Sequence, residues 1–390
     1  MTTLISFLGR SNSDRATGYR KLRYRFENGH VEEVPYIGLA LLGQLKPDRL
    51  VLLGTSGSMW DVFFDHLGST EHILELVEAA EASAVTQELL KAHEAYLTAK
   101  LGVDVHCELI GYGRNNAEQA DILRSLANCI PQGEQVYIDI THGYRHLPML
   151  ALVAARYLHH IRGVEVSEVY YGAEQMKDEG FTPVLRLGGM LQMLNWLEGF
   201  AVFQHSGYYG QFADLLEQDG MPGEDARRLR LAAHLEYHND AAQALTPLRS
   251  AVDRVKQHNG TLGALFRDAL VQRMSWHEQC QRQKRDLAIA DRYLKTNDYL
   301  RATIFLFEAF VTRCVMKQMD YRNPDDYDVR NEARKRALDT SAAARRLDSL
   351  RNALAHGVRG ENQKEISRLL RDESRLLTEL RRLRKELFRD

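Results

Sequence analysis

The sequence predicts two domains of different class, an α/β Rossmann-like N-terminal domain followed by an all-α C-terminal domain. Over the first 190 residues, short β-branched or apolar runs alternate with amphipathic stretches. Beyond about Met190 the β-branched runs stop, and apolar residues recur with a period near 3.6. A chain of 390 residues also exceeds the usual size of one core, so two domains are expected.

Five strands are expected in the first domain because each run is rich in Val, Ile, Leu and Tyr and ends in glycine or polar residues. The runs are "TLISFLG" (3–9), "RLVLLGTSG" (49–57), "DVHCELIGYG" (104–113), "EQVYIDITHG" (134–143) and "VEVSEVYYGA" (164–173). Helices are expected between them at 33–45, 86–102, 117–130 and 147–161. Crossovers of this length favour parallel pairing. One exception is residues 18–34, where alternating residues around Asn28-Gly29 predict a β-hairpin.

Helical periodicity in the second domain is clearest at 190–203, 209–218, 298–319 and 366–387. Gly188 and Gly189 interrupt the pattern in "RLGGMLQ". The predicted domains are therefore 1–189 and 190–390.

The composition indicates a soluble globular protein, with 44% hydrophobic and 27% charged residues. The four cysteines are far apart and form no C-x-x-C pair, which favours a reducing cytoplasm. No apolar run is long enough to span a membrane, and the N-terminus does not resemble a signal peptide. Residues 330–390 carry 17 Lys and Arg against 10 Asp and Glu, a net charge of +7. This excess fits either a polyanion partner or a helix surface laced with ion pairs.

Three loops that follow predicted strands are rich in Gly, Ser, Thr or Asn with a nearby cation: "FLGRSNSD", "LLGTSGSMWD" and "DITHGYRHLP". Loops at the carboxyl ends of parallel strands bind ligands in open α/β sheets, and these offer backbone N–H groups and hydroxyls to phosphates. Helix capping and turn formation explain any single loop equally well. A dinucleotide fingerprint and a P-loop are both missing, so a bound nucleotide acting as a signal is favoured.

The segment "LRNALAHG" places Arg351 and His356 five positions apart on a predicted helix. The spacing alone is not specific, since Arg25 and His30 share it. At about 100° per residue the two side chains lie about 140° apart, so convergence needs a helix end near Gly357 or a second copy of the chain. Such a site suits metal-free RNA cleavage, because histidine moves protons near neutral pH and arginine stabilises charge on phosphorus. An ion-paired arginine near a helix-terminal histidine is the structural alternative.

With these motifs in place, the chain resembles the CRISPR-associated CARF–HEPN ribonucleases of type III systems over nearly its full length. "RNALAHG" is similar to the R-x4-6-H motif of HEPN nucleases, and "DITHGYRHLPML" to the CARF strand-loop-helix with a D-[IL]-T-H-G-[FY]-R signature. The helix with Glu308 resembles the HEPN helix that packs beside the motif.

The resemblance implies a homodimer, with higher oligomers open, that binds a cyclic oligoadenylate across paired CARF domains and cuts single-stranded RNA. Cyclic tetra-adenylate is favoured on this ground. No cofactor is implied. The implied catalytic residues are Arg351, Asn352 and His356. The implied ligand-binding residues are Gly9, Arg10, Ser11, Asn12, Thr55, Ser56, Gly57, Ser58, Thr141, His142, Gly143 and Arg145.

Two other functions are compatible with the same sequence. One is a nucleotide-sensing regulator whose helical half binds DNA or protein without catalysis. The other is a ring nuclease in which the α/β domain degrades the cyclic oligoadenylate, with Thr141 or Ser11 contributing. His234 and His238 have a metal-compatible i, i+4 spacing, but no third ligand follows from the sequence, so no metal is predicted.

Overall fold

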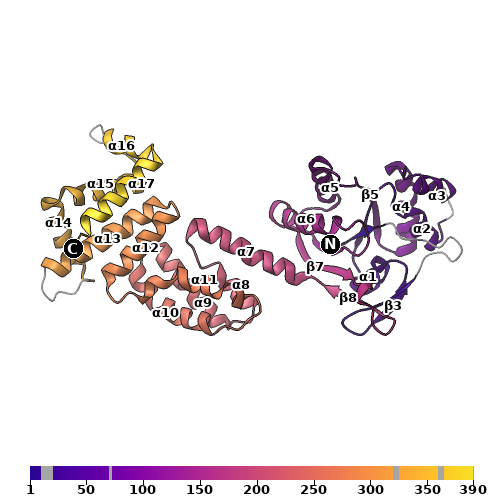
Figure 1. Ribbon diagram of the computed structural model, residues 1–390, viewed down its shortest axis with the longest axis horizontal. Helices are drawn as coiled ribbons and strands as arrows, with labels where there is room; N and C mark the ends of the chain where they lie inside the picture. Colours follow the sequence, from indigo (N-terminus) through magenta and orange to yellow (C-terminus); the bar gives the residue numbers. More distant parts are fainter. Residues whose placement is uncertain (10–20, 70–72, 319–324, 359–363, 390) are drawn as a thin grey trace. The chain divides into compact units, whose positions relative to one another are not determined.

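The computed structural model describes residues 1–9, 21–69, 73–318, 325–358 and 364–389 (Figure 1). It divides into two compact units, Met1–Gln192 and Met193–Asp390. The predicted fold class is confirmed, because the first unit is built around a sheet and the described part of the second is helical. Within the described ranges, no helix is both long enough and apolar enough to cross a membrane.

An eight-stranded sheet forms the centre of the first unit, in the order β3-β2-β8-β7-β6-β1-β4-β5. The strands from β7 to β5 in this order run parallel, β8 pairs antiparallel with β7, and β2 with β3 forms the predicted hairpin. The strands are β1 (Thr2–Leu8), β2 (Leu22–Arg25), β3 (Val31–Val34), β4 (Arg49–Gly54), β5 (Asp104–Leu109), β6 (Gln135–Asp139), β7 (Glu165–Gly172) and β8 (Thr182–Arg186).

Helices cover both faces of this sheet, which gives two apolar cores. The alternation along β1 shows the division, because Leu4 and Leu8 join one core and Ile5 and Phe7 the other. The first core packs against α1 to α4 and the second against α5 and α6. The helices are α1 (Ile37–Leu45), α2 (Trp60–His66), α3 (Ile73–Glu81), α4 (Gln87–Leu101), α5 (Asn116–Cys129) and α6 (Leu147–Arg162), with a 3-10 turn at Glu174–Met176.

Apolar residues of the second unit form one helical core. The helices that lie in this unit, wholly or for most of their length, are α7 (Gly188–Ser206), α8 (Phe212–Gln218), α9 (Gly223–Tyr237), α10 (Ala241–Gln257), α11 (Gly263–Arg273), α12 (Arg282–Lys295), α13 (Tyr299–Gln318), α14 (Tyr327–Thr340), α15 (Ala342–His356), α16 (Lys364–Leu370) and α17 (Glu373–Leu387), with a 3-10 turn at Ser275–Glu278. Helix α13 packs against α12, α14 and α15. The segment expected as one helix at 366–387 is broken, because Asp372 caps a new helix by accepting a hydrogen bond from the Arg375 N–H at 3.1 Å.

Local sequence fixes both ends of α15. Ser341 caps its start, with the hydroxyl accepting a hydrogen bond from the Ala344 N–H at 3.2 Å. Gly357 follows its last residue with φ of +75°, a backbone conformation that glycine adopts without strain. The helix therefore ends at His356, directly before the glycine.

Candidate functional site

The loops after β1, β4 and β6 meet at one edge of the sheet, because these three strands are neighbours and run parallel. Gly9, the segment 55–58 and the segment 141–145 all belong to this edge. A β-carbon added at Gly9 would lie 2.4 Å from the Gly143 nitrogen, so the two backbones touch. The Met59 N–H also donates to the Gly9 carbonyl at 3.0 Å. Arg10, Ser11 and Asn12 lie outside the described residues.

Asp139 organises the loop after β6. Its fully buried carboxylate accepts hydrogen bonds from the Ser6 hydroxyl at 2.6 Å and from the Thr141 N–H at 2.9 Å. The Thr141 hydroxyl in turn accepts a hydrogen bond from the Gly172 N–H at 2.8 Å, which ties this loop to β7. Gly143 has φ of +113°, which a side chain would oppose. These contacts hold the loop after β6 in one shape.

The loop after β4 is tied down by its own hydroxyls. Thr55 and Ser58 are buried, and the Ser58 hydroxyl accepts a hydrogen bond from the Thr55 N–H at 2.9 Å and donates to the Leu8 carbonyl at 2.7 Å. Gly57 is buried as well, and a β-carbon there would lie 2.9 Å from the Tyr112 hydroxyl. Ser56 is the half-buried member of the loop, and its hydroxyl lies 3.2 Å from the Tyr112 hydroxyl.

His142 has unused hydrogen-bonding capacity. Its Nε2 is buried without a hydrogen-bond partner among the described residues, and its ring packs edge-on against Tyr36 at 5.3 Å. Burial lowers the pKa of His142, although the carboxylates of Asp139 and Glu174 oppose the shift. Burial therefore favours the neutral imidazole. Gly143 and Arg145, in the same loop, are both exposed.

An aromatic and basic cluster at the same edge was missed by the sequence analysis. The Tyr112 and Tyr144 rings lie 5.7 Å apart, and the Arg114 guanidinium lies 4.6 Å from the Tyr112 ring centroid. His146 Nε2 lies 2.7 Å from the Tyr112 carbonyl. Aromatic faces and guanidinium groups stack on bases. The segment "GYGRNN", which follows β5 and holds both Tyr112 and Arg114, is the sequence signal for this cluster.

The second candidate site lies on α15. The Arg351 guanidinium lies 2.8 Å from the Asp348 carboxylate, donates to the Asn352 side-chain oxygen at 3.0 Å and covers the Phe307 ring at 4.4 Å. Burial lowers the pKa of Arg351, and the nearby Asp348 carboxylate opposes that shift. The guanidinium stays charged at neutral pH. His356 is exposed at the helix end. The structure thus holds Arg351 against the core and leaves the histidine accessible, and no contact between the two side chains is formed within this chain.

Glu308 on α13 serves as an ion-pair partner, since its carboxylate lies 2.6 Å from Arg330 and 3.9 Å from Arg282. The His234 and His238 rings lie 4.3 Å apart, and His238 Nδ1 approaches the His234 carbonyl at 2.8 Å. Among the described residues, no carboxylate or thiol joins these two histidines as a third ligand.

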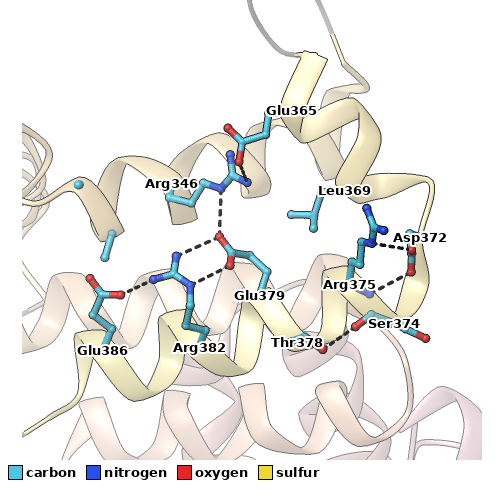
Figure 2. Close-up of a pocket in the computed structure, with 12 residues that line it drawn as sticks. Arg346, Glu365, Leu369, Asp372, Ser374, Arg375, Thr378, Glu379, Arg382 and Glu386 are labelled. Atoms are coloured by element: carbon cyan, nitrogen blue, oxygen red, sulfur yellow. Dashed lines mark hydrogen bonds and ion pairs between the residues drawn. The ribbon is translucent and has the colours of Figure 1, made fainter.

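A cleft of about 870 Å³ between α15, α16 and α17 is separate from Arg351 and His356. Figure 2 shows Arg346 between Glu365 and Glu379, at 2.7 and 3.1 Å. Arg382 likewise lies between Glu379 and Glu386, and it lowers the pKa of Glu379. The arginines in this cleft are matched by carboxylates, so it offers no excess charge to a phosphate. For this reason we do not assign the functional site to this cleft, despite its volume.

Comparison with known proteins gives two findings. Residues 3–175 match the family model described as the CARF domain of the CRISPR system endoribonuclease Csx1. The chain is also 26% identical to the CRISPR-associated protein MJ1674 of Methanocaldococcus jannaschii over 263 residues, or 61% of this chain. That match spans 41% of the relative's own length. The family match covers the strand-end loops described above and ends before α7.

Proposed function

Residues 3–175 are a CARF domain of the CRISPR-associated kind, and from this premise we propose that the protein is a metal-independent single-stranded RNA endoribonuclease activated by a cyclic oligoadenylate. It would act in type III CRISPR antiviral defence. The observation that carries the nuclease part is the arrangement on α15, where Arg351 is preorganised and His356 is accessible.

The sensor would be the loop cluster at the carboxyl edge of the CARF sheet. Backbone N–H groups around Gly9 and Gly143, the hydroxyl of Ser56 and the cation of Arg145 supply donors for phosphates. Tyr112 and Tyr144 offer faces for adenine stacking. A two-fold symmetric dimer offers the same donors to both halves of a ring-shaped ligand, which supports a homodimer that binds cyclic tetra-adenylate.

The nuclease chemistry needs no cofactor. The 2′-hydroxyl of the RNA attacks the adjacent phosphorus, and the product carries a 2′,3′-cyclic phosphate. His356 transfers the proton, either from the 2′-hydroxyl or to the leaving 5′-oxygen. Arg351 stabilises the charge that develops on the phosphoryl oxygens. Asn352 bonds to Arg351 and, through its amide nitrogen, to Asp348 at 3.2 Å, so its role is to orient the arginine.

Two copies of α15 would complete the site. The angular separation of Arg351 and His356 on one helix keeps them apart, and a partner protomer supplies the second set across a two-fold axis. The ring activates by binding the cleaving arrangement more tightly than the resting one.

One observation favours a second candidate, a non-catalytic nucleotide-sensing regulator. Arg351 forms an ion pair with Asp348, as expected for a purely structural arginine. The two candidates differ in whether RNA is cut.

The deciding experiment is cleavage of a fluorescent single-stranded RNA by the full-length protein in EDTA, with and without a panel of cyclic oligoadenylates. Arg351→Ala and His356→Ala should abolish cutting and retain ring binding. Arg375→Ala is a matched control, because Arg375 also pairs with an aspartate three residues before it, at 3.1 Å. His205→Ala is the second control, since His205 is an exposed histidine in the last turn of α7. Ring binding by wild type without cutting by any ring would favour the regulator.

A further inference from the structure

Three potential metal ligands gather beside the edge strand of the CARF sheet. Ligand atoms of His106, Glu108 and Cys129 all lie within 4.8 Å of one another. His106 Nε2 lies 3.2 Å from Glu108 Oε2. Across the described ranges, no other set of three or more His, Cys, Asp or Glu side chains comes as close together. The sequence analysis missed this group because 20 residues separate Glu108 from Cys129 and no short motif contains both.

The fold explains why these side chains meet. His106 and Glu108 are two residues apart on β5, so both face the same side of the sheet. Cys107, between them, points into the opposite core with α4. Cys129 is the last residue of α5, which covers the face that His106 and Glu108 occupy. Strand and helix thus supply ligands to one point.

A fourth residue orients the imidazole. Glu94 on α4 reaches around the sheet edge, with Oε1 3.1 Å from His106 Nδ1. The same oxygen accepts a hydrogen bond from the Cys107 N–H at 2.8 Å, which anchors the carboxylate on the edge strand. A carboxylate on the far ring nitrogen fixes the tautomer and aims the other nitrogen at a metal, as is usual for histidine ligands.

We propose that His106 Nε2, a Glu108 carboxylate oxygen and Cys129 Sγ bind one transition-metal cation of the zinc class. Nitrogen, oxygen and thiolate sulfur together suit Zn²⁺, which takes four ligands in tetrahedral geometry. Two ligand atoms that are each about 2.0–2.1 Å from one ion lie a little over 3 Å apart in that geometry, in agreement with the 3.2 Å between His106 and Glu108. The His106 side chain is 33% exposed, so water can take the fourth position.

Arg49 is the positively charged side chain that would repel a cation at this site. Arg49, on β4, lies close enough to interact with His106, but its guanidinium is held 2.7 Å from the Asp104 carboxylate. Glu94 and Glu108 bring two negative charges to the cation. Binding requires a neutral His106 and loss of the Cys129 thiol proton, so protons are released as Zn²⁺ enters.

The metal would join the edge strand to α5 in the CARF domain. The outward N–H groups of β5 are already covered by α4 side chains, since Gln87 bonds to Leu109 N–H at 2.7 Å and Thr98 to Val105 N–H at 3.1 Å. Zn²⁺ would add a link from β5 to α5, on the other face of the sheet. This inference is independent of ring binding and RNA cleavage, so its test does not depend on either activity.

The test is a Zn²⁺ titration of the full-length, EDTA-treated and desalted protein, read by competition with a chromophoric chelator. The expected result is one tight site per chain, which Cys129→Ser and His106→Gln abolish. Glu94→Gln should weaken binding by about 10–100-fold, because it removes only the orienting carboxylate. Cys280→Ser, at the exposed cysteine of the second unit, is the matched thiol control, and His234→Gln is the matched histidine control. Far-ultraviolet circular dichroism checks that each variant is folded.

Co²⁺ gives an independent readout that does not rely on affinity. Bound at the proposed site, Co²⁺ should show the strong visible bands of tetrahedral coordination and a thiolate charge-transfer band. That band should disappear in Cys129→Ser and remain in Cys280→Ser. Absence of tight Zn²⁺ binding by wild type would overturn the proposal. So would a tight site that survives in folded Cys129→Ser and His106→Gln variants.

Discussion

The Asp348 carboxylate lies 2.8 Å from the Arg351 guanidinium, one helical turn away on α15. The same carboxylate also lies 3.1 Å from Arg334 on α14. Two guanidinium groups share one carboxylate, so the cluster keeps one net positive charge while both arginines are held in place. The side chains of Asp348 and Arg351 are only 15% and 20% exposed, which limits screening by solvent.

Asp348→Asn should reduce RNA cleavage through Arg351 rather than through ring binding. The amide keeps the shape of Asp348 but removes the negative charge that lies between Arg334 and Arg351. We expect a loss of about 1–2 kcal/mol in unfolding free energy, discounted for partial exposure, and cleavage at saturating ring at least about tenfold slower. Urea denaturation and single-turnover cleavage measure the two effects. Asp121→Asn, in an exposed pair with Arg124, is the control. Unchanged cleavage in Asp348→Asn would show that Arg351 needs no such support.

Gly9→Ala should disturb the proposed ring-binding loops by displacing the loop after β6. The new methyl would lie 2.4 Å from the Gly143 nitrogen, which is backbone and cannot rotate away. Overpacking of this kind costs about 1–3 kcal/mol. We expect a lower melting temperature and weaker binding of a cyclic oligoadenylate by isothermal titration calorimetry.

Gly189→Ala is the matched control for that substitution. Gly189 lies in α7, and a β-carbon there meets nothing within 4 Å. Alanine in a helix is favoured over glycine by about 0.5–1 kcal/mol, so stability should stay constant or rise. Equal ring affinity in both variants would contradict the role assigned to the Gly9–Gly143 contact.

Secondary structure was easiest to predict where a hydrophobic pattern continues over a long segment of the sequence. The five parallel strands, the hairpin at Asn28-Gly29 and the helical second half all appear as expected. Strand β8 was missed because it is short and contains Pro183, which suits an edge more than an interior strand. Strand β8 is nonetheless an interior strand, between β7 and β2. The Pro183 carbonyl accepts a hydrogen bond from the Ala173 N–H at 2.9 Å.

The sites were less predictable because their partners are distant in sequence. The motif around Thr141 could be recognised locally, yet its hydroxyl bonds to Gly172, 31 residues away. Tyr112 joins the same edge only because β5 lies beside β4 in the sheet. Long-range strand order decides these contacts, and no spacing within one motif encodes it.

Thr141→Val should weaken ring binding by loosening the loop after β6. Valine has the same shape but cannot accept the hydrogen bond from the Gly172 N–H, which would then be left unpaired at a cost of about 1–3 kcal/mol. Thr141→Ser retains the hydroxyl and is the matched control. Ring affinity measured by calorimetry should fall in the valine variant and stay near wild type in the serine variant. Equal loss in both would point to a role for the threonine methyl instead.

Asp286→Asn should change how stability depends on pH. Burial raises the pKa of Asp286 to about 7, although Arg282, Arg330 and Arg285 oppose the shift and Glu308 adds to it. The native state therefore binds a proton that the unfolded state, with a pKa near 4, has already lost. Stability consequently falls as the pH rises from about 4 to about 7, by no more than about 4 kcal/mol.

The asparagine variant lacks this ionisation, so its stability should be close to wild type at pH 4 and higher than wild type at pH 8. Urea denaturation at pH values between 4 and 8 measures the difference between the two slopes. Asp214→Asn, at a side chain that is 65% exposed, controls for loss of a surface carboxylate. Parallel stability curves for wild type and Asp286→Asn would mean that Arg282, 3.6 Å from the carboxylate, keeps Asp286 ionised in the folded protein.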